Sequence, residues 1–81
     1  MRMLDAQKEQ SVLILQLYLT PEEAREMRER LDGLLADPEA DEHFHLPLDS
    51  AGRELSCSIV TPRKLKEVRY TALERKILEE K

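Results

Sequence analysis

Residues 42–61 read EHFHLPLDSAGRELSCSIVT, and this stretch decides the fold. Apolar residues recur at every second position on both sides of a central Asp-Ser-Ala-Gly sequence. Period-two alternation indicates strands with one buried face, and the central residues favour a turn. The stretch therefore predicts a β-hairpin in which apolar side chains face one another across the ladder. The expected cross-strand pairs are Leu48 with Arg53, Leu46 with Leu55 and Phe44 with Cys57.

Threonine caps on either side of this hairpin predict helices. Before it, residues 20–23 read Thr-Pro-Glu-Glu, which is a capping box with proline at the first helical position, and the Asp-Pro pair at 37–38 ends that helix. After it, the Thr-Pro pair at 61–62 predicts a short helix. Residues 71–74 form a second capping box, so we expect a break at 69–71 and a final helix from Ala72.

The segment 11–19 reads SVLILQLYL, with leucine at every odd position from 13 to 19. This pattern predicts a first strand that is apolar on one face and largely apolar on the other. The element order is then β-α-β-β-α. We expect an α+β fold with one three-stranded antiparallel sheet in the order 1-3-2 and with the helices on one face. That order puts Pro47, which has no N–H to donate, on an edge strand.

Composition limits the domain organisation and the class of partner. The chain has 81 residues, of which 37% are charged, with a net charge of −4 and a single cysteine. We expect a flexible N-terminus at 1–10 and a single α+β domain at 11–81. The acidic balance argues against a general nucleic-acid partner. No apolar run approaches the ~20 residues that span a bilayer, so we expect a cytoplasmic protein.

Two histidines supply the sharpest candidate site. His43 and His45 are two apart on a strand and so project from one face. Glu54 is expected diagonal to His45 across the hairpin. We interpret this polar face as a partner-binding surface; the alternative is a metal site on the two histidines. The expected partner-binding residues are His43, His45, Glu54, Ser56 and Ser58.

Two further surfaces are candidates for binding. A basic cluster around the short helix could contact RNA or another anionic partner, although acidic residues interleave with it and aromatic residues are few. An edge strand that is apolar on both faces also favours pairing between two copies of the chain. The basic cluster comprises Arg63, Lys64, Lys66 and Arg69. The dimer edge comprises Val12, Ile14 and Tyr18.

Catalysis and cofactor binding are not expected. Cys57 falls on the core face of its strand, where a free thiol behaves as a small hydrophobic group. Ser56 and Ser58 share a face with the histidines, but the chain has only two glycines and lacks a nucleophile elbow or a phosphate-binding loop. We therefore predict no enzymatic activity, no catalytic residue and no cofactor.

The chain also resembles small bacterial proteins regarded as immunity partners of polymorphic toxins. The resemblance rests on three stretches: LTPEEA at 19–24, HFHL at 43–46 and ELSCSIVTP at 54–62. It implies a small α+β fold and inhibition of a toxin by direct binding. The leading hypothesis is a non-enzymatic protein-binding module, with a toxin as partner and a homodimer as assembly. A metal-binding protein that uses His43 and His45, and a weak RNA-binding module, are the alternatives.

Overall fold

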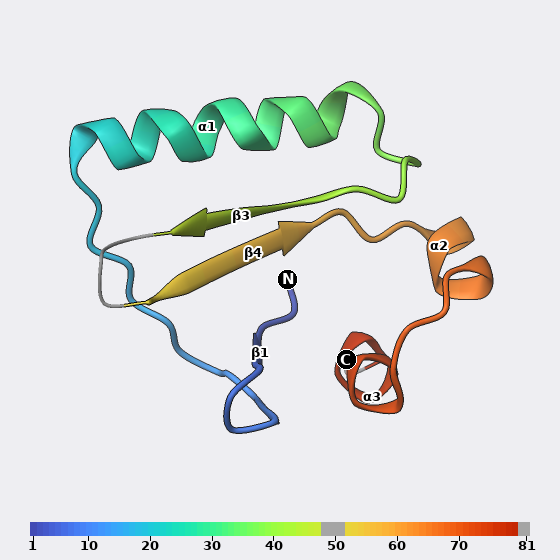
Figure 1. The fold of residues 1–81 in the computed structure, drawn as a ribbon. Helices are drawn as coiled ribbons and strands as arrows, with labels where there is room; N and C mark the ends of the chain where they lie inside the picture. The colour runs from blue at the N-terminus through green and yellow to red at the C-terminus, as the bar shows by residue number, and fades with distance from the viewer. Residues whose placement is uncertain (48–51, 80–81) are drawn as a thin grey trace. The chain divides into compact units, whose positions relative to one another are not determined.

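A computed structural model of the chain describes residues 1–47 and 52–79. Its contacts divide into two compact units, Met1–Leu17 with Arg69–Lys81, and Tyr18–Val68. The order of the elements is β1, β2, α1, β3, β4, α2 and α3 (Figure 1). Their bounds are β1 Leu4–Asp5, β2 Gln10–Ser11, α1 Pro21–Ala36, β3 His43–Pro47, β4 Glu54–Ser58, α2 Pro62–Glu67 and α3 Ala72–Leu78.

Helix α1 begins and ends where the sequence predicts. Thr20 is its N-cap: the Thr20 hydroxyl accepts from the Glu23 N–H at 3.2 Å, and the Glu23 carboxylate accepts from the Thr20 N–H at 2.8 Å. This capping box satisfies two backbone donors that the first turn leaves without partners. The bond to the Thr20 N–H lowers the pKa of Glu23, since it favours the carboxylate form. The helix ends at Ala36, with Asp37 as C-cap.

Strands β3 and β4 form the hairpin in the predicted register. Phe44 pairs with Cys57 and Leu46 pairs with Leu55, which confirms the apolar pairs that the alternation predicts. The expected pair of Leu48 with Arg53 and most of the expected turn lie outside the described residues. Gly52, two residues before β4, has φ 82°, a left-handed conformation that glycine adopts without steric cost.

The core of Tyr18–Val68 lies between α1 and one face of this hairpin. Helix α1 packs on β3, as Figure 1 shows, and the β3 residues Phe44 and Leu46 are buried with Leu34 of α1. The apolar side of β4 is less well covered, as the partial burial of Leu55 and Cys57 shows. Partly buried apolar residues packed against the core are Met27, Cys57 and Ile59.

The three-stranded sheet in the order 1-3-2 is wrong. The described residues form two separate two-stranded antiparallel sheets, β1 with β2 and β3 with β4. Within 11–19 only Ser11 is in a strand, and Val12 donates its N–H to the Met3 carbonyl at 2.9 Å. The rest of the segment has no assigned secondary structure. Alternation along one segment favours a strand but does not encode a ladder partner, which depends on packing between distant residues.

The other helices follow their caps. Thr61 caps α2, and its hydroxyl accepts from the Lys64 N–H at 3.2 Å. Thr71 and Glu74 form the second capping box at the start of α3. The expected break at 69–71 is confirmed, since α2 ends at Glu67 and α3 begins at Ala72.

The N-terminal residues form a turn that the alternation does not predict. Leu4 pairs with Ser11 and Asp5 with Gln10. The Asp5 carboxylate accepts the N–H groups of Gln7 and Lys8, both at 3.0 Å, and this local bonding shapes the turn. Glu9, the last residue of this turn before β2, has φ 56°, which is in the left-handed region.

Candidate functional site

The expected partner-binding residues all lie on the polar face of the β3–β4 hairpin. The ladder places His43 opposite Ser58 and His45 opposite Ser56. All five side chains, Glu54 included, are exposed, while the alternate residues are buried on β3 and partly buried on β4. The structure therefore brings together the residues that the sequence assigns to this face, which we call the polar hairpin face.

Contacts along this face join three of the five residues. The Nδ1 atom of His45 contacts the Oε1 atom of Glu54, which pairs with Pro47 and so lies diagonal to His45 as expected. The rings of His43 and His45 meet edge to face, with centroids 4.8 Å apart and an interplanar angle of 83°. About half of each side chain in the His45–Glu54 pair is exposed, so water screens the interaction strongly.

This geometry does not assemble a metal centre. Across residues 1–47 and 52–79, no group of three or more His, Cys, Asp or Glu side chains could hold a metal ion. Instead, these side chains contact one another: the histidine rings stack edge to face, and His45 contacts Glu54.

Cys57 lies away from this face. It pairs with Phe44 on the side of the hairpin that packs under α1. Partial burial raises the pKa of the Cys57 thiol, because desolvation disfavours the thiolate. The surroundings of Cys57 therefore disfavour the thiolate, which is the reactive form of cysteine.

The predicted basic cluster is not one cationic surface. Arg63 donates from Nε to Glu39 Oε2 and from Nη1 to Glu67 Oε2, each at 2.7 Å, and from Nη2 to the Glu39 carbonyl. The bond to Arg63 lowers the pKa of Glu39, and the same bond raises the pKa of Arg63. The guanidinium thus ties α2 to the loop after α1. Lys66 and Arg69 are exposed.

Lys64 has a structural role that sequence reasoning missed. Only 3% of its surface is exposed, and Nζ donates to the Ile59 carbonyl at 3.0 Å. That carbonyl comes directly after β4, so the ammonium satisfies an acceptor where the ladder ends. The available signal was that Lys64 follows Ile59 by five residues, with the Thr61 cap between them. Because Arg63 and Lys66 are also basic, the sequence instead indicated a surface lysine.

The segment 13–18 is the most unusual surface in the described chain. It is uncharged and contains no helix or strand, and Leu13, Ile14 and Tyr18 are each at least 85% exposed. Leu15 and Leu17 between them are 50% and 42% exposed. Among described residues no backbone-to-backbone hydrogen bond involves 13–18. Of the expected dimer edge, Ile14 and Tyr18 are therefore fully open, whereas Val12 is partly buried.

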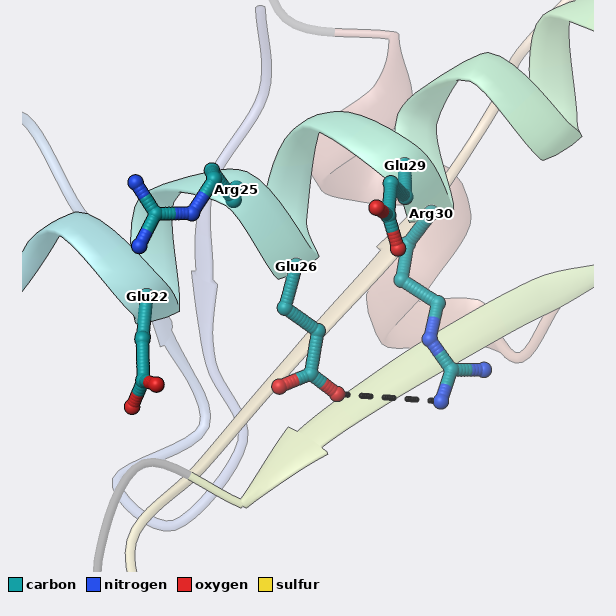
Figure 2. A pocket seen from close by; sticks show the side chains of 5 residues that line it. All are labelled: Glu22, Arg25, Glu26, Glu29 and Arg30. Carbon is teal, nitrogen blue, oxygen red and sulfur yellow. Dashed lines mark ion pairs between the residues drawn. The ribbon is translucent and has the colours of Figure 1, made fainter.

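A shallow hollow on α1 adds no chemistry. Its lining is Glu22, Arg25, Glu26, Glu29 and Arg30, all on the outer face of one helix (Figure 2). Glu26 and Arg30 form an ion pair at 3.7 Å with more than half of each side chain exposed. These residues form a solvated helix face of mixed charge that encloses no volume for a substrate.

Comparison with known proteins gives no match: no protein-family model fits the chain, and no curated protein or solved structure is significantly similar to it. Within the described part of the chain, none of the helices combines the length and the apolar character needed to cross a bilayer.

Proposed function

We propose that the chain is a small non-enzymatic protein-binding module. The observation that carries this proposal is the exposed apolar segment 13–18. In a chain with 37% charged residues, this segment has none. Solvated linkers are polar, and contiguous apolar surface of this kind marks a site that another protein covers.

The backbone of the segment indicates how it binds. Its N–H and C=O groups have no backbone partner among described residues, and leucine occupies its alternate positions 13, 15 and 17. When such a segment becomes extended, it binds by adding a strand to the edge of a sheet. Main-chain hydrogen bonds then provide affinity, and alternate side chains provide specificity.

The polar hairpin face is the second binding surface of the module. Its exposed histidine, serine and glutamate side chains offer donors and acceptors at fixed ladder positions. The resemblance to immunity proteins indicates the class of partner to test there, a bacterial toxin domain. We assign the finer function of immunity-type inhibitor to this face. Neither metal binding nor RNA binding has an observation in its favour.

Hydrogen exchange tests the module. Amides of 13–18 should exchange fast in the isolated, dilute chain and slowly once a protein covers them. We expect protection in the chain purified under native conditions from its own host, where its partner is present. Fast exchange of these amides in every such preparation would contradict the proposal.

Calorimetric titration tests the toxin assignment. The probe is a toxin domain, taken from the gene immediately upstream where that gene encodes one, titrated against the full chain. His45→Ala and Glu54→Ala should each weaken binding about tenfold, as is usual for a contact at the centre of an interface. Lys66→Ala, an exposed substitution away from the polar hairpin face, is the control and should bind normally. Equal affinity for all variants would refute the assignment.

A further inference from the structure

We infer that the protein that covers this segment is a second copy of the same chain, which receives residues 13–17 as a third strand along the outer edge of its β4. The inference rests on the proposed function only in taking the segment as a strand-adding element. It identifies the partner and the edge, and each chain of the pair both donates and accepts a strand.

The acceptor is the less covered strand of the hairpin. In the described sheet, β4 has β3 as its ladder neighbour on one side, which leaves the backbone of the other edge without a strand. On its apolar side Leu55 and Cys57 remain partly exposed, because α1 contacts β3. An unpaired edge with a half-covered apolar side is a site for strand addition.

The faces of donor and acceptor match in polarity. The odd positions of the donor, 13, 15 and 17, are leucine, and the odd positions of β4 carry its apolar side chains. An antiparallel pairing centred on Leu15 and Cys57 puts apolar beside apolar on the α1 side. A shift by one residue would move every leucine to the polar side. The resulting pairs along β4 are Ile14 with Ser58, Leu15 with Cys57, Gln16 with Ser56, and Leu17 with Leu55. Leu13 then lies beside Ile59, the residue directly after β4.

Several features favour a second copy over an unrelated protein. Donor and acceptor belong to the same sequence, so a twofold dimer satisfies both segments and both edges without a third component. The donor carries no charge, so its insertion brings no unpaired charge into the new interface. It also belongs to the unit Met1–Leu17 with Arg69–Lys81, whereas β4 belongs to Tyr18–Val68, and an element of one unit can pair with the edge of a second copy, as in a strand exchange.

A pair of matched variants tests the inference by sedimentation equilibrium of the full chain. Leu13 and Ile14 are adjacent and almost equally exposed, at 89% and 85%, but lie on opposite faces of the donor strand. Leu13→Lys should weaken the dimer about a hundredfold, since the twofold assembly contains the change twice and each buried leucine contributes about tenfold. Ile14→Lys should leave the dimer within about threefold of the unmodified chain, because its side chain stays in solvent. A monomer at all concentrations, or equal effects of the two variants, would overturn the inference.

A disulfide test identifies the edge and distinguishes exchange between chains from pairing within one chain. Cys57 is the only native cysteine, and the register places it opposite residue 15 of the other copy. Under mild oxidation the Leu15→Cys variant should form disulfide-linked dimers, in which the new cysteine of each copy bonds to Cys57 of the other copy. The Ile14→Cys variant should form markedly fewer disulfide-linked dimers. A disulfide-linked monomer would overturn the inference.

Hydrogen exchange then separates the two proposals. If the chain is a monomer whose 13–17 amides exchange fast alone but slowly in complexes with another protein, the dimer fails and the protein-binding module stands. If the amides are protected in a monomer, both proposals fail.

Discussion

Leu34 and Leu35 are neighbours on α1 with opposite environments, and they provide a direct test of the core. Leu34 is 7% exposed and packs against Phe44 and Leu46, whereas Leu35 is 60% exposed. Substitution by alanine removes the same atoms at both positions, and the change in helix propensity is the same. Any difference in the free energy of unfolding between the two variants therefore reports burial.

The magnitude follows from how much of each side chain leaves water. Leucine to alanine removes about 2.4 kcal/mol of transfer free energy at a fully buried site, and the residual cavity raises the total to about 2–5 kcal/mol. Leu34→Ala should therefore lower the free energy of unfolding by about 3 kcal/mol. Leu35→Ala, with most of its side chain already in solvent, should lower it by about 1 kcal/mol or less.

Urea denaturation followed by circular dichroism measures this difference, provided that the slope against urea concentration stays constant. The chain should be kept dilute so that association does not contribute. If Leu34→Ala does not fold, Leu34→Val and Leu35→Val provide the same comparison, with an expected difference of about 1 kcal/mol. Equal losses at the two positions would refute the packing of α1 on the hairpin.

Three further outcomes are expected. Thr20→Ala should lower the free energy of unfolding by about 1 kcal/mol in urea denaturation, and Thr20→Ser should restore it, because only the hydroxyl caps α1. The pKa of Glu39 is lowered in the folded chain, so its contact with Arg63 stabilises the fold above the unfolded pKa and is lost as pH falls through the folded pKa. Thermal denaturation between about pH 5 and pH 3 should therefore show a smaller acid destabilisation for Glu39→Gln than for the unmodified chain. Glu9→Gly should stabilise the N-terminal turn by about 0.5–1 kcal/mol, because glycine accepts φ 56° without steric cost, and unchanged hydrogen exchange of the Gln10 amide would contradict this.

Local chemistry explains why the helices and the hairpin could be predicted. A threonine cap and a glutamate three residues later specify a helix start within one turn, and both capping boxes form as expected. The hairpin register is likewise local, since the loop length and the apolar alternation together allow one pairing, that of Phe44 with Cys57.

The sheet order could not be predicted in this way. The segment 11–19 has the side-chain pattern of a buried strand, and the prediction assigned it a partner from topology rules alone. Which edge such a segment joins depends on the relative free energies of distant packings. The leucine alternation of 13–17 indicates which face would be buried, but not whether the strand partner lies in the same chain or in another. The polar hairpin face was predictable because it depends only on alternation within β3 and β4.

The charged residues show the same division between local and distant information. Arg63 and Lys64 belong to a basic run by composition, yet each is bound to an acceptor remote in the sequence or across a cap. Glu39 is 24 residues from Arg63, and no pattern in the sequence links the two. A charge cluster read from sequence alone therefore overestimates the cationic surface available to a ligand.

The small core and the exposed segment have one physical cause. In the described residues of Tyr18–Val68, the buried apolar residues are Leu34, Phe44 and Leu46, all from α1 and β3. A two-stranded sheet is marginal in water and needs a third strand or a helix on its face. Helix α1 is the helix that covers β3, but it leaves β4 half covered. In the proposed dimer the uncharged segment 13–17 would complete the other half. Strand addition and stability are then linked, because whatever pairs with β4 stabilises the fold as it binds.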